Sequence, residues 1–213
     1  MTDIAVIDYG MGNLRSVWQA LEHVAQGKQV TVTSDPDIIA AAERVVFPGQ
    51  GAMPDCVAEL DKRGLRHAVM DAAASKPFLG ICIGQQLLFE HSEEGDVAGL
   101  GILPGRVRRF PSGMTDAAGG KLKVPHMGWN QVVQVTDHPL WNGIAKDARF
   151  YFVHSYYVDP AEPNLIAAQT DYPFSFASAV ARDNIFAVQC HPEKSQQAGL
   201  ALLSNFVNWD GRP

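Results

Sequence analysis

The sequence predicts an α/β protein with an open mixed sheet flanked by helices. In the first half, short apolar runs alternate with longer helical patterns, which is typical of parallel strands joined by helices. From about Gly105 onward, short β-rich runs follow one another, and helical signals are sparse until the last helix. These two observations indicate a parallel sheet that an antiparallel second half extends. No segment has the composition of an interdomain linker, so we expect residues 1–213 to form a single domain.

Buried strands and helical patterns account for the first half. Apolar residues recur at helical spacing from Leu14 to Ala25, and Gly27 supplies a stop signal. A second helix-like pattern covers Gln85 to Glu90. The expected strands are 4–7, 30–33, 44–47 and 77–81. Each is short and rich in apolar residues, as strands buried on both faces of a parallel sheet are.

The second half is predicted to hold short strands, one exposed loop and a final helix. The expected strands are 106–110, 131–135, 149–158, 165–170, 174–180 and 185–189. Helical spacing returns over 196–209. Residues 111–120 have the Gly, Pro and Ser content of a loop, and we expect a mobile hairpin tip there.

Composition excludes several classes of protein. A net charge of −6 is a poor match to a phosphate backbone, so we expect no nucleic-acid partner. No run approaches the roughly 20 apolar residues of a membrane span, and Asp3 stands where a secretory signal needs basic residues. The three cysteines form neither a disulfide framework nor a zinc-binding CxxC pair. We therefore expect a soluble, cytoplasmic protein with no metal and no cofactor.

The sharpest local motif places a cysteine at a strand-to-helix turn. Gly80-Ile81-Cys82-Ile83-Gly84 has the G-x-nucleophile-x-G form of a nucleophile elbow, with an apolar strand before it and a helical pattern after it. The glycines permit a sharp turn and close approach of neighbouring backbone. The N-terminus of a following helix favours thiolate over thiol. A buried core cysteine is the alternative, but the paired glycines favour a nucleophile at Cys82.

A thiolate needs a base, and His191 is the best candidate. It follows the apolar strand that ends near Gln189, and Pro192 restricts His191 to extended backbone. In that geometry Glu193 lies on the same side as His191 and can orient the ring, which predicts a Cys82–His191–Glu193 relay. A solvent-exposed strand-end histidine remains the alternative. Cys190 should point to the opposite face, and we assign it to packing.

An acyl-transfer site also needs donors for the developing oxyanion. The backbone N–H of Ile83, directly after the nucleophile, is one candidate. The second is the Pro48-Gly49-Gln50-Gly51 turn, where Gly51 can direct an N–H toward the site. This turn follows a predicted parallel strand, and α/β sites gather at the carboxyl ends of such strands.

These motifs resemble those of the class I (triad) glutamine amidotransferases. The resemblance rests on Gly80 to Gln86 together with Gln-Cys-His-Pro-Glu at 189–193. Three further segments, at 8–14, 125–130 and 151–157, are similar to the glutaminase (HisH-type) subunits of imidazole glycerol phosphate synthase. Together the motifs cover nearly the whole chain. The resemblance implies a flavodoxin-like open sheet and glutamine hydrolysis through a glutamyl thioester on Cys82.

The resemblance also implies which residues bind glutamine. By position these are Gly51, Gln86, Glu94 and the His154-Ser155-Tyr156 segment, which adds mainly backbone contacts. Without the resemblance, Glu94 is part of a solvated acidic run and His154 is a satisfied strand histidine. Gln50 departs from the aliphatic residue that many relatives carry there.

A partner protein is implied because free ammonia is largely protonated in neutral water. The chain has no phosphate-binding motif, so we expect the ammonia acceptor site on another polypeptide. The resemblance implies a HisF-type (β/α)₈ barrel subunit that makes imidazole glycerol phosphate and AICAR in histidine biosynthesis. Segments Tyr9 to Asn13 and Met127 to Asn130 are then expected to face it, with Asn13, Met127 and Trp129 at the interface. The alternatives are a helix N-cap for Asn13 and a core aromatic for Trp129.

Three other functions stay open on sequence alone. Another triad amidotransferase subunit, serving anthranilate, purine or pyridoxal phosphate synthesis, is the nearest. A stand-alone cysteine hydrolase such as a γ-glutamyl hydrolase predicts high activity from the isolated chain. A non-enzymatic binding module predicts that Cys82 does not react with a glutamine analogue.

Overall fold

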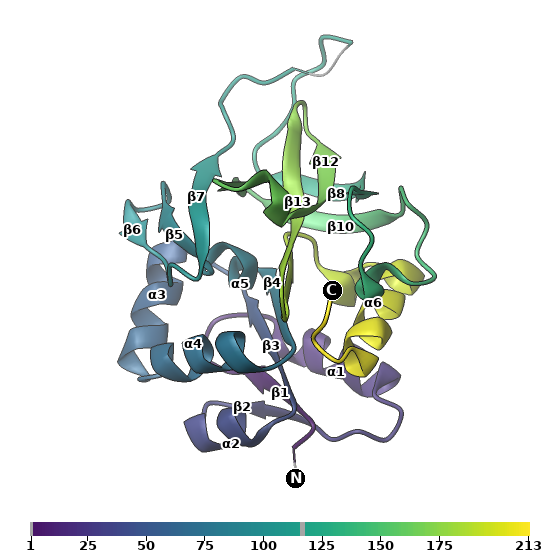
Figure 1. Cartoon of the computed structure of the whole chain (residues 1–213). Helices are drawn as coiled ribbons and strands as arrows, with labels where there is room; N and C mark the ends of the chain where they lie inside the picture. Colours follow the sequence, from purple (N-terminus) through teal and green to yellow (C-terminus); the bar gives the residue numbers. More distant parts are fainter. Residues whose placement is uncertain (1, 116–117) are drawn as a thin grey trace.

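A large open sheet organises the chain (Figure 1), and the computed structural model describes residues 2–115 and 118–213 of it. Five parallel strands form one half of this sheet in the order β2-β1-β3-β4-β14, which is the flavodoxin-like order. Their bounds are β1 Ile4–Ile7, β2 Val30–Thr33, β3 Arg44–Gly49, β4 Phe78–Cys82 and β14 Ile185–Val188. β14 comes from the end of the chain, so the sequence-distant segments of the predicted site meet in neighbouring strands.

Antiparallel strands continue the same sheet beyond β14, as the sequence predicted. The order runs β14-β13-β11-β7-β5-β6, and β12 and β9 join it through β13. β13–β14, β11–β13 and β11–β7 are antiparallel pairs, whereas β5 runs parallel to β7. The bounds are β5 Phe89–Ser92, β6 Val97–Ala98, β7 Leu103–Arg109, β9 Val133–Gln134, β11 Tyr156–Pro160, β12 Ile166–Asp171 and β13 Ser175–Arg182.

A separate pair of strands lies beside the large sheet. β8 (His126–Gln131) and β10 (Arg149–His154) pair antiparallel, with Trp129 opposite Tyr151 and Met127 opposite Val153. Our expected single strand over 149–158 is therefore wrong. The chain bends at Ser155, so that β10 joins this small sheet and β11 joins the large one. The strand expected at 131–135 is likewise divided between the end of β8 and β9.

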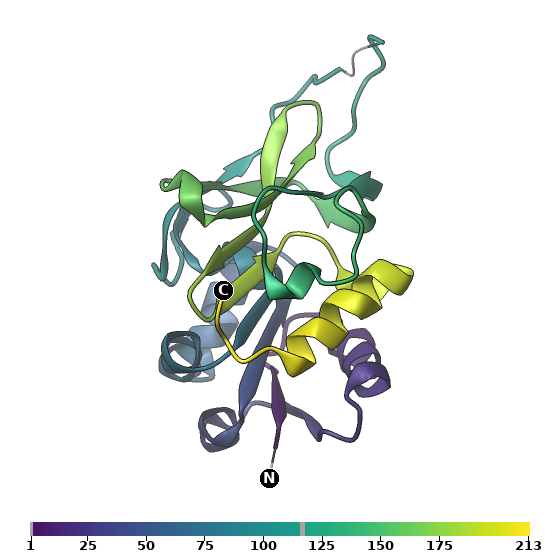
Figure 2. The same ribbon diagram turned by 45° about the vertical axis from the view of Figure 1, so that its right-hand side comes forward.

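Helices cover both faces of the parallel half (Figures 1 and 2). α1 (Leu14–Val24) and α6 (Gln196–Asn208) lie side by side on one face. The other face carries α2 (Pro36–Ala41), α3 (Met53–Lys62) and α4 (Arg66–Ser75). Short 3₁₀ turns are η1 Pro139–Trp141, η2 Pro163–Leu165 and η3 Pro192–Lys194. Among the residues described, no helix has both the length and the apolar character that crossing a membrane requires.

The helix expected over Gln85 to Glu90 is wrong in extent. α5 covers only Ile83–Gln86, and Phe89 already begins strand β5. The residues from Ile83 to Phe89 are all buried, so this segment has no polar face to distinguish a helix from a strand. A single helical turn sums few peptide dipoles, so the helix-dipole argument for a Cys82 thiolate is correspondingly weaker.

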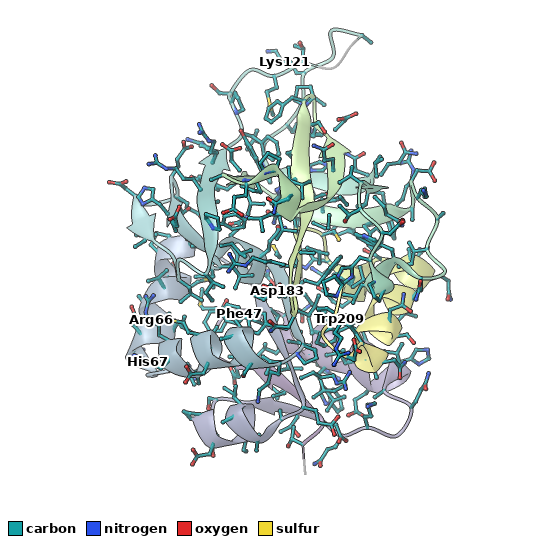
Figure 3. All side chains as sticks on the ribbon, in the orientation of Figure 1. Phe47, Arg66, His67, Lys121, Asp183 and Trp209 are labelled. Atoms are coloured by element: carbon teal, nitrogen blue, oxygen red, sulfur yellow. The ribbon has the colours of Figure 1, made fainter. Side chains whose placement is uncertain are left out.

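The described parts of the loop between β7 and β8, residues 111–115 and 118–120, project beyond the sheet (Figure 1). Thr115 forms an isolated antiparallel bridge with Lys121, and Figure 3 shows Lys121 at this end of the molecule. Two positions of the expected hairpin tip, 116 and 117, lie outside the described residues. Phe47, labelled in the same view, is fully buried and belongs to the core.

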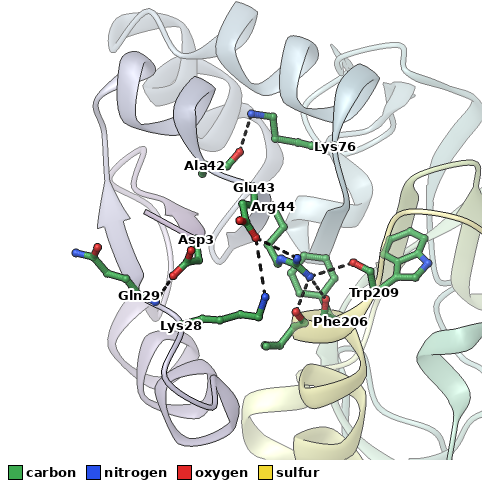
Figure 4. Close-up of polar contacts among 10 residues, drawn as sticks. Asp3, Lys28, Gln29, Ala42, Glu43, Arg44, Lys76, Phe206 and Trp209 are labelled. Carbon is green, nitrogen blue, oxygen red and sulfur yellow. Dashed lines mark hydrogen bonds and ion pairs between the residues drawn. The ribbon is translucent and has the colours of Figure 1, made fainter. Parts of the chain in front are cut away.

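A buried arginine fixes α6 against the sheet. Arg44, the first residue of β3, donates to the carbonyl oxygens of Phe206 (3.2 Å), Val207 and Trp209 (3.0 Å) at the end of α6 (Figure 4). The last carbonyls of a helix lack intrahelical partners and carry partial negative charge, so a guanidinium is well suited to this position. The arginine thereby fixes the helix that follows the His191-Pro192-Glu193 segment.

Candidate active site

The predicted nucleophile, base, orienting carboxylate and oxyanion turn converge at the carboxyl ends of three neighbouring strands, β3, β4 and β14. The register between β3 and β4 pairs Gly49 with Cys82, and the register between β14 and β4 pairs Val188 with Ile81. The turn after β3, the cysteine at the end of β4 and the segment after β14 therefore lie next to one another. The parallel sheet alone accounts for this convergence, because the carboxyl ends of its strands share one edge.

Cys82 occupies a strained turn, as the elbow motif predicted. Its φ of 56° and ψ of −111° lie in a backbone region that residues other than glycine rarely adopt. Both flanking glycines are sterically required. A Cβ at Gly84 would lie 1.8 Å from the carbonyl oxygen of Phe47, and one at Gly80 would lie 2.9 Å from the Cβ of Ala187.

His191 and Glu193 form a buried hydrogen-bonded pair. Nδ1 of His191 lies 2.8 Å from Oε1 of Glu193, and the two side chains are 4% and 1% exposed. The His191 backbone is held as well, because its N–H donates to the Tyr151 carbonyl and its carbonyl accepts from the Ser195 hydroxyl. The solvent-exposed alternative for His191 is therefore wrong.

The second ring nitrogen of His191 is available for proton transfer. Nε2 is buried and has no hydrogen-bond partner in the described part of the chain. Burial lowers the pKa of His191, but its interactions with Cys82 and with Glu193 outweigh burial and raise that pKa to about 10. This environment favours the imidazolium form of His191 beside the sulfur of Cys82.

A cavity of about 260 Å³ opens in front of Cys82 and His191. Its lining includes every residue that the sequence analysis assigned to glutamine or to the oxyanion, together with three that it did not assign, Gln50, Pro125 and Val153. The predicted residues in the lining are Gly51, Ile83, Gln86, Glu94, His154, Ser155 and Tyr156. Glu193 does not line the cavity and lies behind His191.

The turn after β3 packs tightly against Met11 and Cys56. A Cβ at Gly51, whose φ is +114°, would lie 2.8 Å from Cε of Met11. The thiol of Cys56 lies 3.8 Å from the carbonyl oxygen of Gln50, to which it donates. Since Ile83 is the first residue of α5, its N–H has no carbonyl one turn earlier to donate to. Both predicted oxyanion donors thus belong to backbone beside Cys82.

Glu94 is tied to the helix that follows this turn. Its Oε2 accepts a 2.8 Å hydrogen bond from the backbone N–H of Met53, the first residue of α3, and its own N–H donates to Ser92. The neighbouring Gly95 packs on α3, because a Cβ there would lie 2.2 Å from Cγ of Pro54. Glu94 is therefore a positioned carboxylate and not part of a solvated run.

The imidazole of His154 is used within the protein. Its Nδ1 lies 2.8 Å from the Tyr156 carbonyl oxygen, and its Nε2 lies 2.8 Å from Nδ1 of His126. Asn130 Nδ2 donates to the remaining nitrogen of His126 at 3.2 Å. Burial lowers the pKa of His126 to about 4 and that of His154 to about 3. Both rings are neutral at physiological pH, so His154 can offer the cavity backbone groups but no base.

Two apolar side chains of β8 face outward next to the cavity. Met127 is 62% exposed and Trp129 is 41% exposed, and Trp129 makes an edge contact with Tyr151 of β10. Trp129 is thus not a core aromatic. Alternate residues of the two strands, including Phe152 and His154, point to the core. The small sheet therefore has one buried and one apolar exposed face.

The segment before α1 divides between core and surface. Tyr9 is fully buried, so our expectation that it faces a partner is wrong. The hydroxyl of Tyr9 lies close to Gly49, where an added Cβ would approach it to 2.2 Å. Asn13 is half-buried and occupies the N-cap position of α1, but its side chain donates to the Ser16 hydroxyl and makes no capping hydrogen bond. Its surface position leaves it able to meet a partner.

The other two cysteines are buried and unpaired. Burial raises the pKa of the Cys190 thiol well above its usual value, and likewise raises that of Cys56 to about 11, so both are unreactive thiols. Cys190 is 2% exposed, in agreement with its assignment to packing. No group of three or more potential metal ligands occurs among residues 2–115 and 118–213.

Sequence reasoning missed one polar residue of the site, Gln189. Its Nε2 lies 3.7 Å from the sulfur of Cys82, and the side chain is fully buried. The available signal was its position two residues before His191 in a segment predicted to be extended, where both side chains would lie on one face.

The fold and this constellation together define a class of enzyme. The family model described as "Glutamine amidotransferase class-I" matches residues 5–209, and the chain belongs to that family. The enzyme class predicted from the motifs is thereby confirmed.

Curated relatives narrow the assignment. A protein of Aromatoleum aromaticum named "Imidazole glycerol phosphate synthase subunit HisH" is 70% identical over 98% of this chain and 99% of its own length. Proteins with the same name from Nitrosospira multiformis and Dechloromonas aromatica are 68% and 66% identical over 98% and 97% of this chain, covering 99% and 96% of their own lengths. Within its family the chain thus belongs with the HisH subunits, which confirms the branch that the three further motifs indicated.

Solved structures agree on the fold. "Structure of PurLQS from Thermotoga maritima" superposes with a TM-score of 0.73 at 19% identity and covers 98% of this chain and 99% of its own. A Thermoplasma acidophilum protein described as belonging to a GMP synthase gives 0.71 at 18% identity over 98% and 93%. At these identities the likeness shows the fold alone, and the predicted fold class is confirmed.

Proposed function

We propose that this protein hydrolyses L-glutamine to glutamate and ammonia through a glutamyl thioester on Cys82. The observation that carries the proposal is the buried Glu193–His191 pair, whose free Nε2 shares the cavity with a cysteine on a strained turn. This is the nucleophile, base and orienting carboxylate of covalent acyl transfer.

The first half-reaction forms the thioester. With the thiol proton already held on Nε2 of His191, the sulfur of Cys82 attacks the carboxamide carbon of glutamine. As the carbon–nitrogen bond breaks, His191 gives its proton to the leaving nitrogen, which departs as ammonia. Glu193 holds the His191 ring in place throughout, through its contact with Nδ1.

The second half-reaction returns the enzyme. His191 takes a proton from water as the water oxygen attacks the thioester carbon, the carbon–sulfur bond breaks, and glutamate leaves. The proton on His191 and the thiolate of Cys82 then restore the starting pair. In both halves the N–H groups of Gly51 and Ile83, two residues that line the cavity, are expected to receive the developing oxyanion.

The remaining cavity residues are proposed to hold the substrate. Glu94 is a carboxylate suited to the α-ammonium group of glutamine, and Gln86 and Gly51 offer polar groups to its other end. His154, Ser155 and Tyr156 are expected to contribute backbone contacts, since the His154 ring is committed to His126 and Tyr156.

We further propose that the ammonia passes to a HisF-type (β/α)₈ synthase subunit, which uses it to make imidazole glycerol phosphate and AICAR. The relatives are named as subunits of that synthase. Met127 and Trp129 offer an apolar face beside the cavity, and Asn13 precedes the helix next to the oxyanion turn. Exposed aromatic and Met side chains of this kind are typical of interface centres.

Three further expectations accompany this proposal. We expect the protein in the cytoplasm, because the reducing environment there keeps Cys82 as a free thiol. A single core that includes residues from Ile4 to Trp209 supports one domain over residues 1–213. The proposed chemistry uses only side chains and backbone of this chain, so it requires no cofactor.

The test uses the complex of this chain with a barrel synthase subunit. Ammonia-dependent turnover of the formimino intermediate by the barrel should become glutamine-dependent when this chain is added. Cys82→Ala should abolish the glutamine-dependent rate and leave the ammonia-dependent rate unchanged. Full glutamine-dependent activity of Cys82→Ala contradicts the proposal. High glutaminase activity of the isolated chain, independent of any partner, favours a stand-alone hydrolase instead.

A further inference from the structure

A buried side-chain amide lies against the sulfur of the proposed nucleophile, in addition to the base His191. The Nε2 of Gln189 lies 3.7 Å from the sulfur of Cys82, within hydrogen-bond distance for sulfur. Gln189 is fully buried and Cys82 is 5% exposed, so water does not compete effectively for this contact. A buried amide placed against a reactive sulfur needs a physical explanation.

The orientation of the Gln189 amide follows from a backbone carbonyl. The oxygen of Tyr156 can only accept, so the Gln86 atom 3.1 Å from it must be the NH₂ group. That same NH₂ lies 2.9 Å from Gln189, which must therefore present its carbonyl oxygen to Gln86. The other end of the Gln189 amide, its NH₂ group, consequently faces Cys82.

The same carbonyl also anchors this arrangement from the opposite side. Nδ1 of His154 donates to the Tyr156 oxygen, and His154 in turn accepts from His126. The carbonyl thus receives two donors and is fully used. Because neither imidazole is charged near neutral pH, nothing in this network reverses the polarity of the Gln86 and Gln189 amides.

Sheet register explains why Gln189 is so placed. Val188 is paired with Ile81, so the next residues along both strands, Gln189 and Cys82, lie abreast. The backbone N–H of Gln189 donates to Ser178 and holds this segment. His191 follows two residues further on and lines the same cavity as Cys82. One strand end therefore supplies both the base and a second polar group to the sulfur.

We propose that Gln189 is a further catalytic residue, which donates a side-chain N–H to the Cys82 thiolate. This inference rests on the proposed function, since it assigns a role in the same reaction. The hydrogen bond stabilises the thiolate before attack. It also stabilises the sulfur as a leaving group, when the carbon–sulfur bond of the thioester breaks and the electron pair returns to sulfur.

The experiment measures the ionisation of Cys82 directly. The full-length protein is alkylated with iodoacetamide across a pH series, and modification of the Cys82 peptide is followed by mass spectrometry. In Gln189→Met the side chain keeps its size but loses the donor. We expect about a 10- to 100-fold loss of thiolate stabilisation, because a hydrogen bond to a charged group is of that strength. The alkylation midpoint should move to higher pH accordingly.

Two other variants separate this role from a structural one. Gln85→Met removes a buried amide that donates to the Ala187 carbonyl, and whose oxygen has no hydrogen-bond partner in the described part of the chain. It should reduce thermal stability about as much as Gln189→Met while leaving the midpoint in place. Gln189→Glu keeps an oxygen for Gln86 but turns a carboxylate toward the sulfur, so its midpoint should rise further.

The outcomes are distinct. An unchanged alkylation midpoint in folded Gln189→Met overturns the assignment of Gln189, even where Cys82→Ala is inactive and the proposed function stands. Retained activity in Cys82→Ala overturns the proposed function itself. If the Gln189 variants do not fold, the side-chain amide of Gln189 is followed by NMR in the wild-type protein. Its proton resonance should shift as Cys82 ionises, and the absence of that shift overturns the proposal.

Discussion

Replacing Gly84 by alanine tests whether the nucleophile turn depends on close backbone packing. A Cβ at Gly84 would lie 1.8 Å from the carbonyl oxygen of Phe47, which is backbone and cannot rotate away. Since an ordinary carbon–oxygen contact is about 3.3 Å, the two segments must separate by about 1.5 Å. One of them carries Cys82 and the other leads into the Gly49-Gln50-Gly51 turn, so the thiol moves relative to its oxyanion donors.

We expect a much larger effect on activity than on stability. Overpacking costs about 1–3 kcal/mol, whereas misplacing reacting groups by about 1 Å can reduce a rate by about 100-fold. Glutamate release by the partner-bound enzyme measures the activity, and thermal unfolding measures the stability. Gly64→Ala is the control, because Gly64 has a φ of +67° with no atom near a Cβ. It should lose about 1–2 kcal/mol from backbone strain alone.

The comparison between the two alanine variants decides the matter. Gly64→Ala should retain normal glutamine turnover despite its lower melting temperature, since Gly64 lies at the end of α3. Gly84→Ala should lose about 100-fold in turnover, although its melting temperature should be similar to that of Gly64→Ala. If Gly84→Ala keeps wild-type turnover, the close contact with Phe47 does not position the thiol, and the steric reasoning is refuted.

Three more substitutions address the base, the exposed face and the helix anchor. Glu193→Gln should lower the pKa of His191 from about 10, because it removes the negative charge on the oxygen 2.8 Å from Nδ1. Because folding raises the pKa of His191 from 6.5 to about 10, protonated His191 stabilises the folded protein. This stabilisation is complete below pH 6.5 and is lost as the pH rises to about 10. Unfolding in urea at a series of pH values should therefore show this loss in the wild type and a smaller one in the variant; equal slopes contradict the assignment. Trp129→Ala should weaken binding of the barrel subunit by about 30-fold, the effect of losing an interface hot spot. A binding titration measures this, and alkylation of Cys82 in the free chain should not change; undiminished binding argues against Trp129 at the interface. Arg44→Met should reduce the free energy of unfolding by about 3 kcal/mol and the melting temperature by roughly 6–12 °C, because three carbonyls at the end of α6 lose the hydrogen bonds from the Arg44 guanidinium. A melting curve like that of the wild type contradicts this role for Arg44.

Local sequence was sufficient to predict those parts of the site that depend on a few adjacent residues. The glycines around Cys82 and the spacing between His191 and Glu193 constrain backbone geometry over only a few positions. The strands of the parallel half were predictable for the same reason, because each is a short apolar run. The end of α5 at Gln86 was not predictable, since the buried residues that follow show no hydrophobic period that distinguishes a helix from a strand.

Contacts between distant segments escaped prediction. Gln189 and Cys82 lie 107 positions apart in sequence, and His126 and His154 lie 28 apart, so no local pattern relates them. The bend at Ser155 is likewise a consequence of pairing, because it divides one β-rich run between two sheets. Tyr9 was expected to face a partner, but it is fully buried and its ring packs against that of Phe47 in β3.

The sequence by itself determined which groups carry the chemistry: a cysteine between glycines, and a histidine followed two residues later by a glutamate. Only the tertiary structure decided how those groups are held. The register of β4 against β14 brings Gln189 beside Cys82, and a single backbone carbonyl at Tyr156 sets which end of its amide faces the sulfur. The physical reason is that hydrogen-bond polarity inside a protein is fixed by acceptors that cannot reverse, and their positions depend on how the strands assemble.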